Sequence, residues 1–399
     1  MSQVLPATVT GKGAFYAGSV LDHRFGSSDP YTVGVEEEYM LLDGTSFDLV
    51  QHIDTVLAAV KGHELESQVN AELMQSVLEI ATPVCRNPGD VMRELLKLRT
   101  YVAGVARDHG LRVGSAGTHP FSLFEQQRIT ARDRYHQLVD ALQYIARREL
   151  IFGMHIHVAV DDPDKAIQVV NGLLPQLAPL LALSASSPFW RGEPTGLASS
   201  RQMVFAAFPR SGPPPRFRDY ADYAEVVGQL EQTGCIADYT HIWWDIRLHP
   251  RFGTIEIRIC DAITRVEDAV AITAYCQALV KQLSERHDAG EEIPSYHRIL
   301  TTENKWLAAR YGLEAPVMDL ATGRRNRIPV SQLVRRTVRE IEPHARELGS
   351  ERELEGIAEL LSRGNSADRQ LRIFNANRDI REVVEEIAIA TETLPVEAG

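Results

Sequence analysis

The spacing of apolar residues along the chain predicts an ordered domain that contains both strands and helices. In residues 32–42 the side chains alternate with a period of two, which is typical of a half-buried β-strand. One face of this strand would hold Val33, Val35, Tyr39 and Leu41, and the other Gly34, Glu36, Glu38 and Met40. The carboxylates of Glu36 and Glu38 therefore share a face.

Further strands and helices follow from the same kind of pattern. Strands are predicted at residues 151–160, 243–248 and 253–260, and the last two are expected to pair around a turn at 249–252. Helices are predicted at residues 90–109, 135–148, 164–184 and 266–286, with a kink or break at Pro175 and Pro179. The chain from 329 to 391 is predicted to be mainly helical.

The first thirty residues differ from the rest of the chain. They contain scattered Gly, Ser and Pro without sustained periodicity. We expect residues 1–30 to form a flexible N-terminal extension, and residues 31–399 to form a single domain with a helical C-terminal part.

The composition is that of an ordinary globular protein with an acidic balance. Of 399 residues, 44% are hydrophobic, and 42 Lys and Arg stand against 54 Asp and Glu, for a net charge of −12. This charge gives no general attraction to nucleic acid or to an anionic membrane, and we expect neither a signal peptide nor a membrane-spanning helix. Cys85, Cys235, Cys260 and Cys276 form no CxxC pair, which favours reduced thiols and a cytoplasmic protein.

Two short runs of polar residues are candidates for metal binding. The three carboxylates of Glu36, Glu37 and Glu38 repel one another, and in a half-buried strand a cation must neutralise those that face the core. A divalent metal bound by Glu36 and Glu38 would do this, and a solvated acidic edge is the alternative. His155 and His157 also share one strand face, a spacing that suits metal ligands and structural histidines alike.

Two further pairs of residues add charge to this inventory. Glu256 and Arg258 share the polar face of the predicted strand 253–260, either as a structural ion pair or as a metal ligand beside an arginine that binds phosphate. Glu72 and Glu79 are seven residues apart, so they share a face only in a helix or a bent strand. Their spacing alone assigns them no role.

The common nucleotide-binding and hydrolase motifs are missing from the sequence. It contains no GxxxxGK[ST] loop, no GxGxxG after a strand and no GxSxG elbow. A nucleotide would therefore have to bind through metal ions and arginines.

Seven motifs occur in order along the chain: residues 34–39 (GVEEEY), 72–83, 114–120 (GSAGTHP), 153–157 (GMHIH), 244–247 (WDIR), 253–261 and 304–312. Together they resemble the carboxylate–amine ligase branch of the type 2 glutamate–cysteine ligase family. The resemblance extends over residues 32–391, nearly the whole chain, and the number of ordered motifs makes it specific.

The resemblance implies an α+β, glutamine-synthetase-like catalytic fold, in which a curved, mostly antiparallel sheet forms a funnel flanked by helices. It also implies an ATP-dependent ligase that uses Mg²⁺ or Mn²⁺. In such ligases the γ-phosphoryl group of ATP passes to a substrate carboxylate, and an amine attacks the acyl phosphate to form an amide. The expected substrates are the γ-carboxylate of glutamate and an amino acid amine such as that of cysteine.

The same resemblance implies roles for individual residues. The implied metal ligands are Glu36, Glu38, Glu72, Glu79, His155 and Glu256. Glu256 and Arg258 are the implied catalytic residues, since an arginine stabilises charge on a transferred phosphoryl group. Residues implied in binding substrate or nucleotide are Arg201, His157, His119, Trp244 and Arg310. The alternative for Arg201 is a surface position without a binding role. The alternative for His119 and Trp244 is a packed position in the core.

Two other functions stay open from the sequence. One is phosphoryl transfer to a guanidino group, since a related sheet architecture serves such kinases. The other is a nucleotide-binding regulatory protein without turnover, although the chain retains the full acidic and basic set. The resemblance further implies small-molecule substrates, a homodimer, and no nucleic acid or membrane partner.

Overall fold

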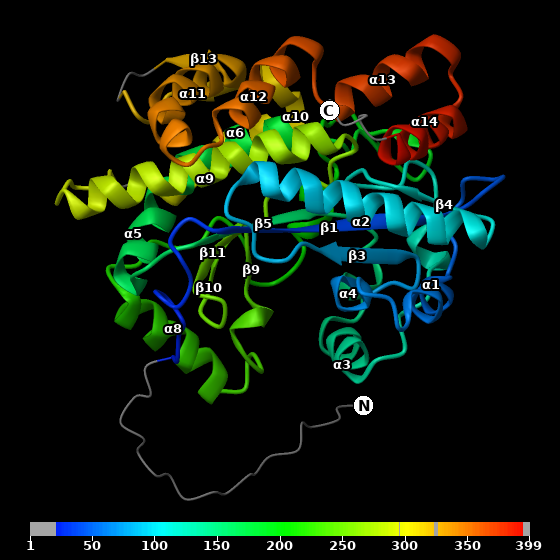
Figure 1. The fold of residues 1–399 in the computed structure, drawn as a ribbon, viewed down its shortest axis with the longest axis horizontal. Coiled ribbons are helices and arrows are strands. Elements are labelled where there is room, and N and C mark those ends of the chain that lie inside the picture. Colours follow the sequence, from blue (N-terminus) through cyan, green and yellow to red (C-terminus); the bar gives the residue numbers. More distant parts are fainter. Residues whose placement is uncertain (1–20, 295, 323–325, 394–399) are drawn as a thin grey trace, which may run out of the picture.

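A seven-stranded antiparallel sheet forms the centre of the described chain, with helices on both sides of it (Figure 1). The computed structural model describes residues 21–294, 296–322 and 326–393. The strand order is β10-β11-β5-β1-β3-β2, and β4 also pairs with β1. These strands are β1 (Val33–Asp43), β2 (Val69–Ala71), β3 (Val77–Ala81), β4 (Leu111–Gly114), β5 (Met154–Ala159), β10 (Ile246–His249) and β11 (Thr254–Ile257).

The remaining strands form small two-stranded sheets, and helices make up most of the rest. The short strands are β6 (Phe189–Trp190), β7 (Glu193–Pro194), β8 (Ser211–Gly212), β9 (Trp243–Trp244), β12 (Pro316–Met318) and β13 (Arg327–Pro329). The helices before the last strand of the main sheet are α1 (Ile53–Val60), α2 (Pro88–Asp108), α3 (Asp133–Leu142), α4 (Tyr144–Arg147), α5 (Pro163–Leu173), α6 (Leu177–Ser184), α7 (Arg201–Phe205) and α8 (Tyr220–Gln232). The helices after it are α9 (Val266–Asp288), α10 (Arg298–Tyr311), α11 (Val330–Glu347), α12 (Glu351–Arg363), α13 (Ser366–Asn377) and α14 (Ile380–Glu392).

Most of the predicted elements are present, with shifts at their ends. The helix predicted at 135–148 is divided into α3 and α4 at Gln143, whose φ of 50° no helix accommodates. The helix predicted at 164–184 is broken between α5 and α6 by the 3₁₀ turn η3 (Leu174–Gln176), which contains Pro175, whereas Pro179 lies inside α6. A proline in the interior removes a helical hydrogen bond, which explains the break.

The stretch Pro163–Ser184 is long and apolar enough to span a membrane by length and composition, which the sequence analysis did not expect. Its mean hydropathy is 1.5, and 78% of its most apolar window is buried inside the domain. Core helices meet the same criterion.

The N-terminal segment is only partly described. Residues 1–20 of the predicted extension lie outside the described residues, but residues 24–26 pack against the chain just after β5 and β10. The backbone N–H of Arg24 donates to Pro250 at 2.9 Å, that of Gly26 donates to Val160 at 3.1 Å, and the side chain of Phe25 is buried. The packed part of the chain thus begins before residue 31.

The apolar face of β1 is covered by helices α2 and α9, which run along one side of the sheet in Figure 1. Val33, Val35 and Tyr39 are almost completely buried there, in an apolar cluster that continues as far as Leu360 in α12. The sheet and the C-terminal helices therefore share one core, and its burial leaves the opposite face of β1 to carry polar residues.

Glu37 is the exception on the apolar face of β1. Its carboxylate is fully buried and accepts hydrogen bonds from Arg99 of α2 at 2.6 and 3.0 Å and from the hydroxyl of Tyr39. Arg99 also donates to the carbonyls of Ile263 and Thr264, at 3.0 and 2.8 Å, just before α9. A buried ion pair with its polar atoms this well satisfied ties β1, α2 and the start of α9 together.

We expect Arg99→Ala to lower the free energy of unfolding by about 3–5 kcal/mol, because it leaves the buried carboxylate of Glu37 without its cation. Chemical denaturation measures the change. Arg93→Ala is the matched control on the same helix, since the Arg93 side chain is 63% exposed, and we expect a change within about 0.5 kcal/mol. Equal stability of the two variants would contradict this account of the core.

Candidate active site

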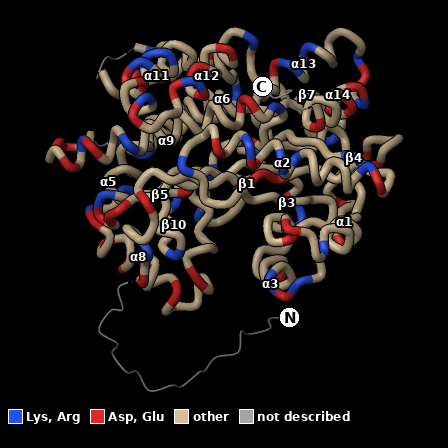
Figure 2. The backbone as a smooth tube through the Cα atoms, viewed as in Figure 1, with Lys and Arg blue, Asp and Glu red and all other residues tan. Residues whose placement is uncertain are grey.

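A cavity of about 380 Å³ lies over the polar face of β1 and its neighbouring strands. Its charged lining brings together residues from distant parts of the chain, and Figure 2 shows acidic positions on β1 in the interior of the molecule. The ionisable lining residues are Glu36, Glu38, Glu72, Glu79, Glu149, Glu256, Arg134, Arg201, Arg247, Arg258, Tyr135, His155, His157, His241 and His249. Many of the residues proposed from sequence are in this set.

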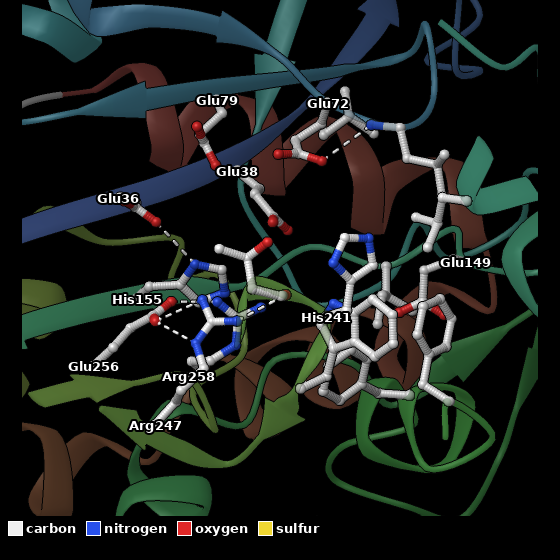
Figure 3. A pocket seen from close by; sticks show the side chains of 18 of the residues that line it. Glu36, Glu38, Glu72, Glu79, Glu149, His155, His241, Arg247, Glu256 and Arg258 are labelled. Carbon is white, nitrogen blue, oxygen red and sulfur yellow. Dashed lines mark hydrogen bonds and ion pairs between the residues drawn. The ribbon is translucent and has the colours of Figure 1, made fainter. Parts of the chain in front are cut away.

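The strand register explains why these side chains meet. Glu36 of β1 pairs with His155 of β5, and Glu256 of β11 pairs with His157 of the same strand. Paired residues of an antiparallel ladder point to the same face, and alternate residues of one strand do too. The alternating pairs Glu36/Glu38, His155/His157 and Glu256/Arg258 thus lie side by side across one face of the sheet (Figure 3).

Glu36, His157 and Glu256 form a group that could hold a metal ion. One ligand atom from each lies within 4.8 Å of the others. Glu36 also contacts both histidines, with 3.1 Å from its Oε2 to Nδ1 of His155 and 3.4 Å from its Oε1 to Nε2 of His157. Burial opposes ionisation of Glu36, but the His157 and His155 rings outweigh it and keep its pKa well below the usual range. Burial, aided by Arg258, lowers the pKa of His155 to about 4, so this imidazole is neutral and can bind a metal.

A second acidic group lies beside the first. Glu38 is paired with Glu79 of β3, and Glu72 follows β2, where the turn into β3 directs it into the same cavity. Burial, together with the charge of Glu72, raises the pKa of Glu38 to about 7, and burial with the neighbouring carboxylates raises that of Glu79 well above its usual value. The bend between β2 and β3 brings the carboxylates of Glu72 and Glu79, seven residues apart in sequence, into the same cavity.

Glu256 is ionised because two arginines hold it. Arg247, its cross-strand partner on β10, donates from Nε at 2.9 Å, and Arg258 forms an ion pair with the other carboxylate oxygen. Burial opposes ionisation, but the two guanidinium groups keep the pKa of Glu256 well below its usual range. Nε of Arg258 is buried and has no hydrogen-bond partner among the described residues. This arginine therefore retains capacity to bind an anion.

Arg201 is the first residue of α7 and is buried at the edge of the cavity. Its Nη1 donates to the carbonyl of Ile259 at 3.3 Å and lies 3.9 Å from Asp261, which also accepts from Ser187 and Ser199. Gly153 lies so close that a Cβ there would be 2.4 Å from Nη2 of Arg201. The absence of a side chain at Gly153 thus leaves room for this guanidinium.

His119, Trp244 and Arg310, which the resemblance implied in binding, do not line the cavity. His119 is buried and bonded to backbone groups, with 2.9 Å from Nε2 to the carbonyl of Phe47 and 2.9 Å from Nδ1 to the N–H of Ser122. Trp244 packs against Phe217, because alternation along β9 directs Trp243 into the cavity instead. Arg310 contacts the carbonyl of Gly196. His119 and Trp244 thus occupy packed positions, which was the alternative to a binding role.

Several lining residues were not predicted from the sequence. They are Glu149, Arg134, Tyr135, Arg247, His241 and His249, beside the apolar members of the wall. A signal existed for Arg247, since pairing the two predicted strands around their turn sets it near Glu256. No comparable pattern marks Glu149, which lies between α4 and β5.

Comparison with known proteins gives a consistent family. The sequence model of glutamate–cysteine ligase family 2 (GCS2) matches residues 32–386. A protein of Rubrobacter xylanophilus that bears the name glutamate–cysteine ligase 2-1 is 43% identical over 364 residues, 91% of this chain and 95% of that protein. A Solibacter usitatus protein named glutamate–cysteine ligase 2 is 40% identical over 90% of this chain and 93% of its own length.

Two solved structures share the fold at low sequence identity. A bifunctional glutathione synthetase from Pasteurella multocida has a TM-score of 0.68 at 16% identity, over 91% of this chain, which spans about half (52%) of that protein. A glutamate–cysteine ligase from Francisella tularensis, solved in complex with AMP, has a TM-score of 0.65 at 13% identity, over 93% of this chain and 91% of that one. The α+β fold class predicted from the sequence is confirmed.

An antiparallel sheet with an acidic, arginine-lined cavity over its polar face suits a carboxylate–amine ligase, and the family match and the relatives agree with that class. The chain belongs to glutamate–cysteine ligase family 2.

We expect Gly153→Ala to reduce turnover by about 10²-fold, because the new methyl group displaces the Arg201 guanidinium from the cavity wall. Steady-state kinetics and a thermal unfolding curve measure activity and folding together. Gly104→Ala in α2 is the matched control, since a Cβ there meets nothing within 4 Å, and it should retain full activity. Full activity in Gly153→Ala would show that Arg201 need not occupy this position.

Proposed function

We propose that the protein is an ATP-dependent ligase that joins the γ-carboxylate of glutamate to an amino acid amine through an acyl phosphate. One observation carries the proposal: carboxylates without an ion pair among the described residues and guanidinium groups that can bind an anion face one another in a single cavity. A metal–nucleotide complex supplies both missing partners. The names of the relatives support glutamate and cysteine as substrates.

The donor set fits Mg²⁺ or Mn²⁺. Glu36 and Glu256 offer carboxylate oxygens with one imidazole, that of His157, within 4.8 Å, and Glu38 and Glu79 offer more carboxylates nearby. Hard oxygen donors suit both ions, and a histidine ligand is compatible with Mn²⁺. When bound, such ions neutralise phosphate oxygens and polarise the γ-phosphoryl group. The family resemblance implied His155 as the metal ligand, whereas His157 is the histidine whose ring nitrogen lies within 4.8 Å of the Glu36 and Glu256 carboxylates.

The arginines would do the remaining electrostatic work. Arg258 faces the carboxylates of the cavity, and we propose that it binds the oxygens of the transferred phosphoryl group. Glu256 fixes the orientation of Arg258 through their ion pair. A free carboxylate is a poor acyl donor, whereas its phosphorylated form carries a leaving group that an amine can displace. Positioning and charge stabilisation thus account for the chemistry without a protein nucleophile.

We also propose a cytoplasmic homodimer that takes small-molecule substrates. All four cysteines are free, which agrees with a reducing compartment. Light scattering of the purified protein measures the oligomeric state directly.

Arg258→Ala should reduce kcat by about 10²- to 10³-fold, because it removes a donor aimed at charge that develops in the transition state. The assay supplies ATP, Mg²⁺, glutamate and a panel of amines, and follows ADP release and product mass. Arg352→Ala, at an exposed position of α12, is the control and should retain wild-type rates.

The product decides among the functions left open from the sequence. An amide with stoichiometric ADP supports the ligase. A phosphorylated guanidino compound without an amide would instead identify a kinase, and nucleotide binding without turnover of any substrate would identify a regulatory protein.

Glu79→Gln should make the metal-free protein more stable than wild type at pH 8, with no difference near pH 4.5. The pKa of Glu79 is raised in the folded state, so folding loses stability as pH rises above the usual glutamate pKa, and the amide removes that loss. The variant should also lose much of the stabilisation by Mn²⁺, because it lacks a carboxylate donor.

Thermal unfolding in EDTA and in Mn²⁺, at both pH values, tests the two effects. Glu355→Gln on the exposed face of α12 is the control and should follow wild type throughout. A Glu79→Gln variant that is no more stable than wild type at pH 8 without metal would contradict the proposed charge repulsion.

A further inference from the structure

Glu149 is a buried carboxylate that the proposed reaction does not use. It lies between α4 and β5 and lines the cavity, and its Oε2 atom is buried without a hydrogen-bond partner among the described residues. Burial raises its pKa to about 8, the nearby charge of Arg201 opposes this, and that of Glu38 adds to it. A buried acceptor without a donor costs free energy, which a bound ligand with a donor would recover.

Glu149 lies apart from the metal-binding group. Figure 3 shows it with His241 on one side of the cavity, while Glu36 and Glu256 lie on the other. It is not a member of the group of Glu36, His157 and Glu256 that could hold a metal ion. A cation at Glu149 would therefore lie outside that group, with Glu38, whose charge acts on Glu149, as the nearer of the metal-site carboxylates.

Four apolar or aromatic residues form an aromatic wall on the side of the cavity where Glu149 lies: Ile151, Phe205, Phe208 and Trp243. Ile151, two residues after Glu149, belongs to an apolar cluster with Phe205 and Phe208, and Trp243 packs against this cluster. The rings of Phe205 and Phe208 are 5.7 Å apart, and those of Phe208 and Trp243 are 5.1 Å apart. All four residues line the cavity.

We propose that this end of the cavity is the acceptor subsite, where Glu149 pairs with the ammonium group of the incoming amine and the aromatic wall receives a bulky apolar side chain. The inference rests on the proposed ligase function and narrows its acceptor to amines with an aromatic or large aliphatic group, in place of the cysteine in the names of the relatives. Glutamate itself fits the wall poorly, because its side chain would bring a second carboxylate against apolar surface. A small side chain would leave the aromatic surface exposed to water, so the favourable free energy of burying that surface would be lost.

The first experiment compares acceptors at saturating ATP, Mg²⁺ and glutamate. We expect kcat/KM for phenylalanine to exceed that for alanine by at least about tenfold, since the difference is several buried carbons. Glu149→Gln should raise the KM for phenylalanine by about tenfold or more and leave the KM for glutamate unchanged. Glu355→Gln is the matched control on exposed α12 and should change neither KM.

A second variant tests the wall separately from the charge. Phe208→Leu keeps an apolar side chain in the cluster, and we expect it to reduce the preference for phenylalanine over alanine while retaining the KM for glutamate. Equal kcat/KM for alanine and phenylalanine in the wild type, or a rise in the glutamate KM instead of the amine KM in Glu149→Gln, overturns the acceptor subsite but leaves the ligase function intact.

Equilibrium binding separates this proposal from the ligase proposal. If no amine yields an amide, the proposed function fails, and calorimetry with phenethylamine then decides the subsite. Binding to wild type that Glu149→Gln weakens about tenfold supports the subsite; equal binding to both, or none to the wild type, overturns it.

Discussion

Carboxylates buried side by side repel one another, and the central sheet contains two different responses to this cost. Some are balanced by guanidinium groups of the chain itself: Glu37 by Arg99 on one face of β1, and Glu256 by Arg247 and Arg258 on the other side of the sheet. Others, among them Glu38 and Glu79, form no ion pair with another described residue and hold their protons at unusually high pH. The Glu37–Arg99 pair stabilises the fold, and the arginines beside Glu256 keep that cavity carboxylate charged. The carboxylates without such partners leave a charge deficit for a ligand to fill.

The antiparallel ladder determines which carboxylates fall into each group. Because β1 pairs with β3, β4 and β5, one strand sets the positions of acidic residues from both halves of the sheet. Moving β1 by a single residue would exchange Glu37 with its neighbours, placing the Arg99 partner in the cavity and two cavity carboxylates in the core. The buried Glu37–Arg99 pair therefore fixes the register on which the cavity depends.

Much of this arrangement could be predicted from local pattern, and the rest depends on contacts between distant segments. Period-two alternation was sufficient to orient Glu36, Glu38, His155 and Glu256, because a strand places alternate residues on one face. The family resemblance, not alternation, implied Trp244 in the cavity, where Trp243 lies. A strand of two residues carries too little pattern to show which of its side chains faces the cavity. Arg99 and Glu149 had no pattern at all: one is an arginine in an amphipathic helix, and the other follows a short helix, so their partners are defined only by tertiary packing.

The N-terminal segment packs so closely against the β10–β11 turn that the turn needs a glycine at position 253. A Cβ at Gly253 would lie 2.3 Å from the carbonyl oxygen of Arg24, and the preceding residue, Phe252, is an exposed aromatic that lines the cavity mouth and stacks on His249 at 4.0 Å. The conformation of this entrance is thus shared between segments more than two hundred positions apart in sequence. A shortened chain, or a fusion joined close to Phe25, would change the shape of the entrance without altering any residue that touches the reacting groups.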